Sequence, residues 1–372
     1  MGKNRTLLTG VIMLLIVVIA LPALPGHAHA QSRLHVVASF SILADVAQNV
    51  AGDAAVVESL MPRGTNPHAY EASAQDVVTL SDADAVFVVG MDFEEGLSSV
   101  LEEAGGDRVV SVSACVPVRA VSTTISGDLA DEEADHADDH DDHDHAHDMS
   151  ATCDTHHTAA EAAFGLNHVD SAGSLGLVMM GVCNTAGSSD DHNHAAGSCD
   201  PHVWTDPVNV GLWALMIRDT LSTLDPANAD QYAANTDAYL AELAALSASI
   251  QAKINSVPQE HRIIVTNHLA FNYFAARYGL TLAGVVIPGG STTSEPSVQD
   301  VLALIETIQD HHVPAIFTET TVSEDLAQQI ADESGAVIVR LYTGSLSEVD
   351  GPAATYLDYM QYNASVIADA LR

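Results

Sequence analysis

The sequence predicts an α/β protein with two βα lobes, each built around a parallel sheet, joined by one long connecting helix. Short runs rich in β-branched residues alternate with segments of helical spacing in both halves of the chain, a pattern typical of parallel βα units. One long apolar stripe lies between the two sets. The length of 372 residues also suits two domains of ordinary size.

The first half of the chain carries three Val-rich runs that we expect to be strands, at residues 34–39, 56–60 and 85–89. Helical spacing occupies 42–50 and 74–81, between those runs. Strand and helix therefore alternate, which predicts an N-terminal lobe over 31–224.

The connecting helix is expected over 225–257. Asp225 is a good N-cap and Pro226 suits the first helical position. Apolar side chains then recur at spacings of three and four, namely Leu240, Leu243, Leu246, Ile250 and Ile254. A helix of about 30 residues reaches about 45 Å, enough to connect two lobes. An ordinary helix packed within one lobe would fit the stripe equally well.

The βα alternation resumes after Pro258, which predicts a C-terminal lobe over 258–372. Strands are expected at 262–266, 281–286, 314–318 and 336–341, with helical segments between them and a last helix over 353–371.

Residues 1–30 have the three parts of a secretory signal peptide. Lys3 and Arg5 form a charged start, an apolar stretch follows over 7–20, and the small residues of 28–30 (Ala-His-Ala) suit cleavage. An apolar run of about 14 residues falls short of the ~20 needed to span a bilayer, so we favour cleavage over a retained membrane anchor. No Cys lies near the cut, so we do not expect a lipid anchor. The mature protein is therefore expected in the periplasm.

The charge of the chain restricts its partners. With 12 Lys and Arg against 50 Asp and Glu, its formal net charge is −38. Phosphate binding needs clustered Lys and Arg, so the composition argues against nucleic acid as a partner. It also argues against docking on anionic membrane surfaces.

Four cysteines remain in the chain: Cys115, Cys153, Cys183 and Cys199. An even number in an exported protein predicts disulfides, and three connectivities are possible. Thiolate ligation of a metal is the alternative, but no C-x-x-C spacing is present.

A polar insertion is expected over about 121–198. Residues 131–148, which we call the His/Asp tract, contain ten Asp or Glu residues and five His: His136, His140, His143, His145 and His147. Such a segment cannot bury a core and is expected to be mobile. It could be a solvated acidic loop, but imidazoles and carboxylates are both zinc ligands, so we favour auxiliary capture of metal ions.

Three histidines outside the tract are candidate metal ligands. His68 follows a predicted strand, His202 lies between two prolines, and His268 ends the first strand of the second lobe. Ligands of open α/β sheets bind beyond the carboxyl ends of strands. Spacing alone is weak evidence, since such histidines are more often capping or surface groups.

The surrounding segments carry a family resemblance. Residues 66–71 (Asn-Pro-His-Ala-Tyr-Glu), 200–207 (Asp-Pro-His-Val-Trp-Thr-Asp-Pro) and 267–280 together resemble the periplasmic zinc and manganese solute-binding proteins of ABC importers. Residues 37–45 are similar to that family's opening strand and helix, and 295–297 and 354–357 fit its second lobe. The resemblance runs from about residue 34 to the C-terminus, interrupted by the insertion.

The resemblance implies one metal ion held between the lobes, with the long helix limiting their hinge motion. His68 and His202 match the family's two first-lobe ligands, and His268 matches its first second-lobe ligand. Three imidazoles suit Zn²⁺ better than Mn²⁺, which remains the alternative. The expected partners are a divalent metal ion and an ABC permease in the inner membrane, and the protein is expected to be a monomer.

The fourth ligand is left open. The family commonly has an Asp where this chain has Gly344. Water could take the fourth position, or Glu319 could supply a carboxylate, although Glu319 could equally accept a hydrogen bond from a ligand. An open position would also be compatible with a three-His zinc hydrolase. No His-Glu-x-x-His segment or general-base motif supports that alternative, and we expect no enzyme.

Overall fold

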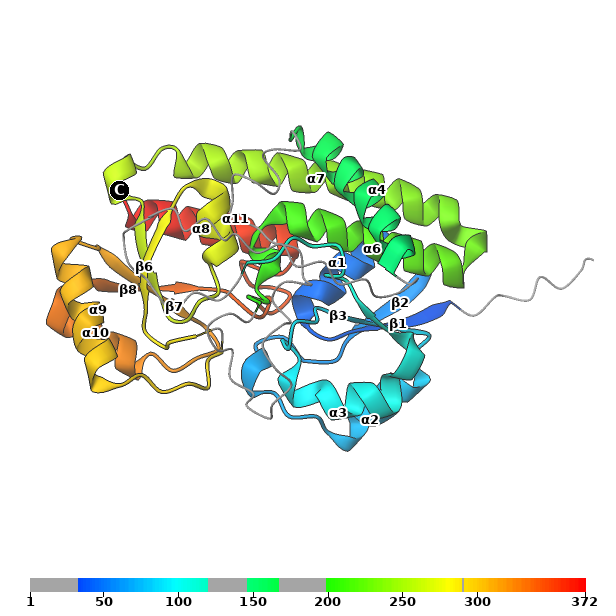
Figure 1. The fold of residues 1–372 in the computed structure, drawn as a ribbon, viewed down its shortest axis with the longest axis horizontal. Helices are drawn as coiled ribbons and strands as arrows, with labels where there is room; N and C mark the ends of the chain where they lie inside the picture. The colour runs from blue at the N-terminus through cyan, green and yellow to red at the C-terminus, as the bar shows by residue number, and fades with distance from the viewer. Residues whose placement is uncertain (1–32, 120–145, 167–198, 290) are drawn as a thin grey trace, which may run out of the picture. The chain divides into compact units, whose positions relative to one another are not determined.

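The computed structural model describes residues 33–119, 146–166, 199–289 and 291–372 of the chain. Two four-stranded sheets lie within these residues, and all strands of each sheet are parallel (Figure 1). Helices connect successive strands in both halves. The predicted fold class, two βα lobes with parallel sheets and a long helix, is confirmed.

The first sheet has the strand order β2-β1-β3-β4. Its strands are β1 (Leu34–Ala38), β2 (Ala55–Ser59), β3 (Ala85–Val88) and β4 (Val109–Ser111), with helices α1 (Ser41–Ala51), α2 (Ala74–Asp82) and α3 (Ser98–Val100). The three predicted strands are found within about one residue at each end. β4 was not predicted, because three half-buried residues are too few to show a period.

The second sheet has the order β6-β5-β7-β8. It contains β5 (Ile263–Thr266), β6 (Thr281–Val285), β7 (Ala315–Glu319) and β8 (Val337–Leu341), with helices α8 (Asn272–Tyr278), α9 (Val298–Asp310), α10 (Asp325–Ser334) and α11 (Tyr356–Ala370). The four predicted strands are all present. β1 is an internal strand of the first sheet, and β5 is an internal strand of the second. The loops that follow these strands lie at the carboxyl edge of each sheet, where ligands of open α/β sheets bind.

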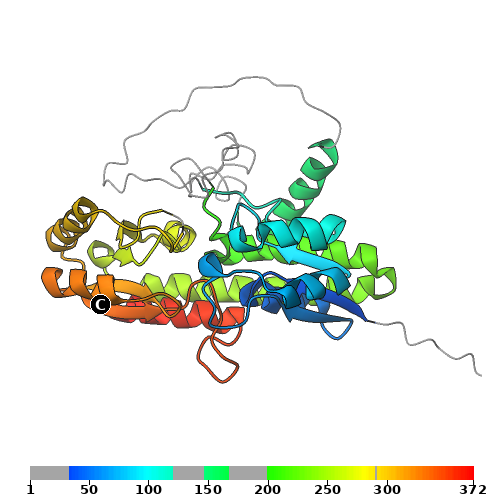
Figure 2. The same ribbon diagram turned by 90° about the horizontal axis from the view of Figure 1, so that it is seen from below.

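The long helix α7 (Ala229–Ile254) begins four residues later than predicted. Pro226 instead starts a short 3-10 turn, and Asp225 accepts hydrogen bonds from Asn228 Nδ2 (2.6 Å) and Tyr232 Oη (3.0 Å). The five residues of the predicted stripe are buried. α7 contacts α1 and α6 from the first half and α8 and α11 from the second, so it packs along both halves (Figures 1 and 2).

Helix α6 (Pro207–Leu224) was not predicted. All of its residues from 207 to 217 are buried, so it lacks the polar face that makes an amphipathic helix visible in a sequence. The described residues between 33 and 372 pack as one unit, and one hydrophobic cluster among them joins Val36 and Val86 of the first sheet to Phe317 and Leu341 of the second. The lobe boundaries at 224/225 and 257/258 therefore stay a prediction.

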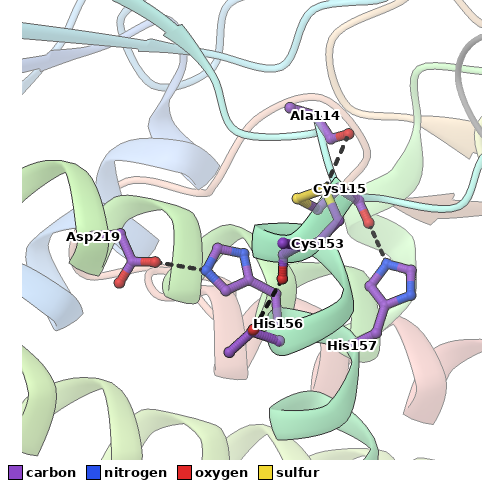
Figure 3. Close-up of a disulfide and its surroundings, with 8 residues drawn as sticks. Ala114, Cys115, Cys153, His156, His157 and Asp219 are labelled. Atoms are coloured by element: carbon purple, nitrogen blue, oxygen red, sulfur yellow. Dashed lines mark hydrogen bonds and ion pairs between the residues drawn. A yellow bond between two sulfur atoms is a disulfide. The ribbon is translucent and has the colours of Figure 1, made fainter. Parts of the chain in front are cut away.

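Helix α4 (Ala146–Phe164) lies inside the predicted insertion and is packed against the body of the protein. Cys153 forms a disulfide with Cys115 (Figure 3). His156 Nε2 lies 2.7 Å from Asp219 Oδ2 on α6, and His157 Nε2 lies 2.6 Å from the carbonyl oxygen of Cys115. The expectation that a segment cannot bury a core concerned the acidic tract, and the residues that follow 148 within the insertion are packed.

The disulfide prediction is confirmed for Cys115 and Cys153. Cys199 is also disulfide-bonded, and Cys183 lies outside the described residues. The leader and most of the His/Asp tract lie outside them too. Among the described helices, none combines the length and the apolar character needed to cross a membrane.

Candidate metal centre

His68 lies in a 3-10 turn, Pro67–Ala69, that follows β2. Asn66 caps the turn by accepting a hydrogen bond from the backbone N–H of His68 (3.2 Å), and Pro67 suits the first position. The imidazole is buried, with an exposed fraction of 8%. The Asn-Pro-His sequence thus fixes the backbone from which His68 projects.

His202 lies in the loop before α6, and Asp200 holds it twice. Asp200 Oδ1 accepts hydrogen bonds from the backbone N–H of His202 (3.0 Å) and from its Nδ1 (2.9 Å). Burial raises the pKa of Asp200 to about 6, against the opposing effect of the His202 N–H. Tyr273 of α8 donates to the carbonyl oxygen of Asp200 (2.7 Å), which connects this loop to the second half of the chain.

His268 follows β5 and is held by Glu319 at the end of β7. The Thr266 hydroxyl donates to the carbonyl oxygen of His268 (2.7 Å), which shapes the turn after the strand. Nδ1 of His268 contacts Glu319 Oε1, and the Thr343 hydroxyl donates to Glu319 Oε2. Burial alone would raise the pKa of Glu319, but His268 and Thr343 outweigh that effect and lower it.

The three imidazoles converge on one point. His202 Nε2 lies 3.1 Å from His68 Nε2 and 3.0 Å from His268 Nε2. One ring nitrogen from each residue lies within 4.8 Å of the others. Nitrogens bound to one tetrahedral Zn²⁺ at ~2.05 Å would lie about 3.3 Å apart. Among the described residues, this is the group of His, Cys, Asp and Glu side chains that could hold an ion.

The hydrogen bonds at the far side of two rings decide which nitrogen faces the centre. A carboxylate accepts but does not donate, so Nδ1 of His202 and of His268 carries the proton. In the neutral ring, Nε2 then presents its lone pair to the shared centre. This arrangement is the usual one for histidines that bind metals.

Glu319 and Gly344 differ in what they contribute. Glu319 is directed at the far nitrogen of His268 and is not part of the converging group. Gly344 packs against the turn that bears His68, since a Cβ at position 344 would lie 2.8 Å from both Cγ and Cδ of Pro67. The glycine therefore permits a close approach between two loops that are distant in sequence.

An aromatic cluster surrounds the histidines, and no sequence pattern pointed to it. The Phe93 ring packs edge-on against His68 at 5.5 Å between centroids, and Trp204 lies 5.2 Å from His202. Phe93 and Trp204 also contact each other at 4.8 Å, and both are fully buried. The rings exclude water from one side of the imidazoles.

The auxiliary histidines of the tract are not placed by the structure. His136, His140, His143 and His145 lie outside the described residues, and His147 belongs to α4 without a described side chain. The residues that flank the undescribed segments are placed: Asp200 N donates to the carbonyl oxygen of Arg119 (2.7 Å). Arg119, the last described residue before the first gap, therefore lies beside the loop that carries His202, and α4 lies between the two undescribed segments.

Comparison with known proteins gives a family and several relatives. The family model described as ZnuA, zinc-uptake complex component A, periplasmic, matches residues 36–370. The manganese-binding lipoprotein MntA of Halalkalibacterium halodurans is 28% identical over 339 residues, covering 91% of this chain and 88% of the relative. The iron-binding protein YfeA of Yersinia pestis is 26% identical and covers 90% of this chain and 86% of the relative.

Solved structures share the fold. The periplasmic zinc-binding protein TroA of Treponema pallidum has a TM-score of 0.67 and 25% identity, covering 91% of this chain and 99% of that one. A Mn-bound periplasmic metal-binding protein of Candidatus Liberibacter asiaticus has a TM-score of 0.66 at 23% identity, covering 91% of this chain and all of the other.

Proposed function

This chain belongs to the ZnuA family, whose members are metal-binding solute-binding proteins of ABC importers and not enzymes, and we propose that Zn²⁺ is the ion it carries. Such proteins work outside the cytoplasm with a permease and an ATPase of the inner membrane. Membership of this family argues against the alternative of a three-His zinc hydrolase. The ion itself and the residues that bind it are our proposal.

The observation that carries the proposal is the convergence of three histidine Nε2 atoms, two of them oriented by carboxylates behind the ring. Zn²⁺ is commonly held by nitrogen ligands in tetrahedral geometry, and three imidazoles leave one position for water or another ligand. We therefore assign His68, His202 and His268 as ligands. Glu319 is assigned to orienting His268, in place of the alternative that it binds the ion directly.

Manganese is the second candidate, because the Halalkalibacterium relative is named a manganese-binding lipoprotein. Mn²⁺ favours oxygen ligands. Here the two carboxylates that contact the candidate ligands, Asp200 and Glu319, each accept a hydrogen bond from a ligand ring and face the side of the ring away from the shared centre. Position 344, where the family commonly has an Asp, is a glycine. The donor set therefore supports zinc over manganese.

Metal competition on the purified mature protein tests the proposal. Zn²⁺, Mn²⁺ and Fe²⁺ should be titrated against a chelator of known affinity, for the unaltered protein and for His68→Ala, His202→Ala and His268→Ala. Each substitution should weaken zinc binding by more than about a hundredfold, since even outer partners of ligands change affinity about 10- to 100-fold. Affinity should also fall as pH drops through the range in which imidazole protonates.

The matched control is His261→Ala, because His261 is an exposed histidine at the end of a 3-10 turn. Its zinc affinity should equal that of the unaltered protein. Tight, stoichiometric zinc binding by the triple His→Ala protein would refute the ligand assignment. Preference for Mn²⁺, with the three ligands still required, would refute the zinc assignment alone.

We further propose that the protein is exported with its leader cleaved after residue 30, as a periplasmic monomer. The relatives include named lipoproteins, so a lipid anchor is the competing form. The absence of Cys near the proposed cut supports cleavage without lipidation. The intact mass of the mature protein, measured in the membrane and membrane-free fractions of its native cells, distinguishes the two. A lipid adds mass and retains the chain in membranes, whereas the cleaved chain without lipid is found in the membrane-free fraction. Its sedimentation tests the monomer.

The His/Asp tract is proposed to capture ions for the tight site. Ten carboxylates attract divalent cations and five imidazoles can bind them weakly. Arg119, the last described residue before the segment that contains most of the tract, bonds through its backbone to Asp200 and to Tyr273 Oη (2.8 Å), next to His202, which supports this role. Deleting 131–148 should remove weak sites from a zinc titration and slow uptake when zinc is scarce. Loss of the tight site or unfolding of the variant would contradict this division of roles.

A further inference from the structure

The loop after β3 has a backbone that is costly to form. Gly90, Met91 and Asp92 have φ angles of 83°, 57° and 59°, three left-handed residues in succession. Glycine adopts this conformation without steric cost, whereas Met91 and Asp92 adopt it at the cost of backbone strain. Contacts elsewhere in the structure must therefore hold the loop in place.

Glu94 supplies those contacts. Its side chain is buried, with 6% exposed, and its carboxylate accepts three hydrogen bonds. Oε1 accepts from the Ser39 hydroxyl (2.8 Å) and from the Val89 backbone N–H (2.7 Å), and Oε2 accepts from the Gly90 N–H (3.1 Å). One carboxylate thus ties the loop to the carboxyl ends of β1 and β3. Burying a carboxylate is unfavourable unless hydrogen bonds such as these three compensate for the lost hydration.

The loop that Glu94 holds supports the turn containing His68 at two points. Phe93, fully buried, places its ring edge-on to the His68 ring, with an interplanar angle of 84°. Gly96 lies against the backbone just beyond that turn, since a Cβ at position 96 would come 1.9 Å from the carbonyl oxygen of Tyr70. Both contacts depend on the conformation of the loop.

We propose that Glu94 is a positioning residue for the metal site. By holding residues 90–92 in their left-handed conformation it fixes Phe93 and the 67–69 turn, and so directs His68 Nε2 to the point that His202 and His268 share. Glu94 acts through the loop and touches neither the ion nor a ligand. The inference rests on the proposed function, because it requires His68 to bind the metal.

Two substitutions disturb this support in different ways. Glu94→Gln keeps an oxygen for Ser39 and Val89 but turns an NH₂ group towards the Gly90 N–H, so that one hydrogen bond becomes a contact between two donors. Gly96→Ala leaves Glu94 intact and pushes a methyl group into the Tyr70 carbonyl oxygen. The control is Glu103→Gln, which removes an exposed carboxylate nearby in the chain.

The experiment measures zinc affinity by chelator competition, the visible spectrum of the Co²⁺-substituted protein, and the melting temperature without metal. Glu94→Gln and Gly96→Ala should each weaken zinc binding about tenfold, as loss of an outer partner of a ligand does, and should shift the cobalt spectrum because His68 moves. Glu103→Gln should match the unaltered protein in all three measurements.

The outcomes separate this inference from the proposed function. A lower melting temperature in both variants, with unchanged zinc affinity and cobalt spectrum, would show that Glu94 serves the fold alone and would overturn the inference. If that result were found together with a large loss of zinc affinity in His68→Ala, the assignment of the three histidines as ligands would still hold. If His68→Ala itself bound zinc as tightly as the unaltered protein, the proposed function would fail first.

Discussion

In the candidate metal centre, His268 and His68 are supported by different contacts, although His202, like His268, is held by a carboxylate. In the second half, Glu319 bonds directly to the His268 ring and is itself held by the Thr343 hydroxyl. In the first half, the edge of Phe93 packs against the His68 ring, and Glu94 holds the loop that carries Phe93. Glu319 acts on the His268 ring through a hydrogen bond, and Phe93 acts on the His68 ring through packing.

The difference has a chemical consequence. A carboxylate on Nδ1 fixes the orientation and the tautomer of the ring and makes Nε2 a more basic ligand. An aromatic edge fixes position but changes the electronic character of the imidazole little. Changes at Glu319 should therefore alter the basicity of the His268 ring, and changes in the loop that carries Phe93 should act on zinc binding and the cobalt spectrum through the position of His68.

Among the residues that surround the candidate ligands, the largest effect is expected at Glu319. Glu319→Ala should weaken zinc binding about a hundredfold, because it removes the partner of His268 Nδ1 and leaves a buried donor unpaired. Glu319→Gln should weaken it about tenfold, since the amide oxygen can still accept from Nδ1 while the negative charge is lost. Chelator competition measures both, and Glu306→Gln on the exposed face of α9 is the control.

The Glu319 pair also tests its assignment as an orienting residue. If Glu319 bound the ion directly, Gln would be nearly as damaging as Ala, because a neutral amide is a poor substitute for a carboxylate ligand. Equal losses of zinc affinity in the two variants would therefore indicate that Glu319 is a metal ligand.

An intermediate effect is expected at Gly344. Gly344→Ala places a Cβ 2.8 Å from Pro67, which should displace the turn carrying His68 and weaken zinc binding about tenfold. Gly344→Asp has the same steric cost but adds an oxygen ligand, so its Mn²⁺ affinity should exceed that of the Ala variant. The comparison of Asp with Ala isolates the carboxylate. A zinc affinity in the Ala variant equal to that of the unaltered protein would show that the Pro67 contact is not required.

The last effect, which concerns stability and not zinc binding, is a pH dependence caused by Glu94. Burial raises the pKa of Glu94 to about 7, against opposing hydrogen bonds from Val89, Ser39 and Gly90. Between the ordinary carboxyl pKa of about 4.3 and about 7, the folded protein holds a proton that the unfolded chain releases. The free energy of unfolding therefore falls as pH rises through this window and levels off above it.

Denaturation of the metal-free protein checks this sign. The unfolding free energy of the unaltered protein relative to Glu94→Gln should decline by up to about 1.4 kcal/mol per pH unit between pH 5 and 7, because glutamine does not titrate. The remaining groups are the same in both proteins and cancel in the difference. A difference that rises with pH would mean that the hydrogen bonds lower the pKa of Glu94 more than burial raises it.

Sequence patterns predicted most strands because the pattern of each strand is local. Runs such as 34–39 and 85–89 are dense in Val, and their identity as strands needs no knowledge of distant residues. α6 escaped prediction because burial on every side removes the periodic signal, and α4 because the acidic residues before it dominated the composition of its segment. The start of α7 was misplaced because Asp225 and Pro226 suit a 3-10 turn as well as a helix.

The sequence by itself determined the family, the candidate ligands and the presence of disulfides, since short motifs and residue counts carry that information. Only the tertiary structure decided which residues surround the ligands. Glu319 reaches His268 across 51 positions, Glu94 reaches Ser39 across 55, and Gly344 packs on Pro67 from the opposite end of the chain. The physical reason is that parallel strands bring their carboxyl ends to one edge, so residues with no local relation become neighbours there.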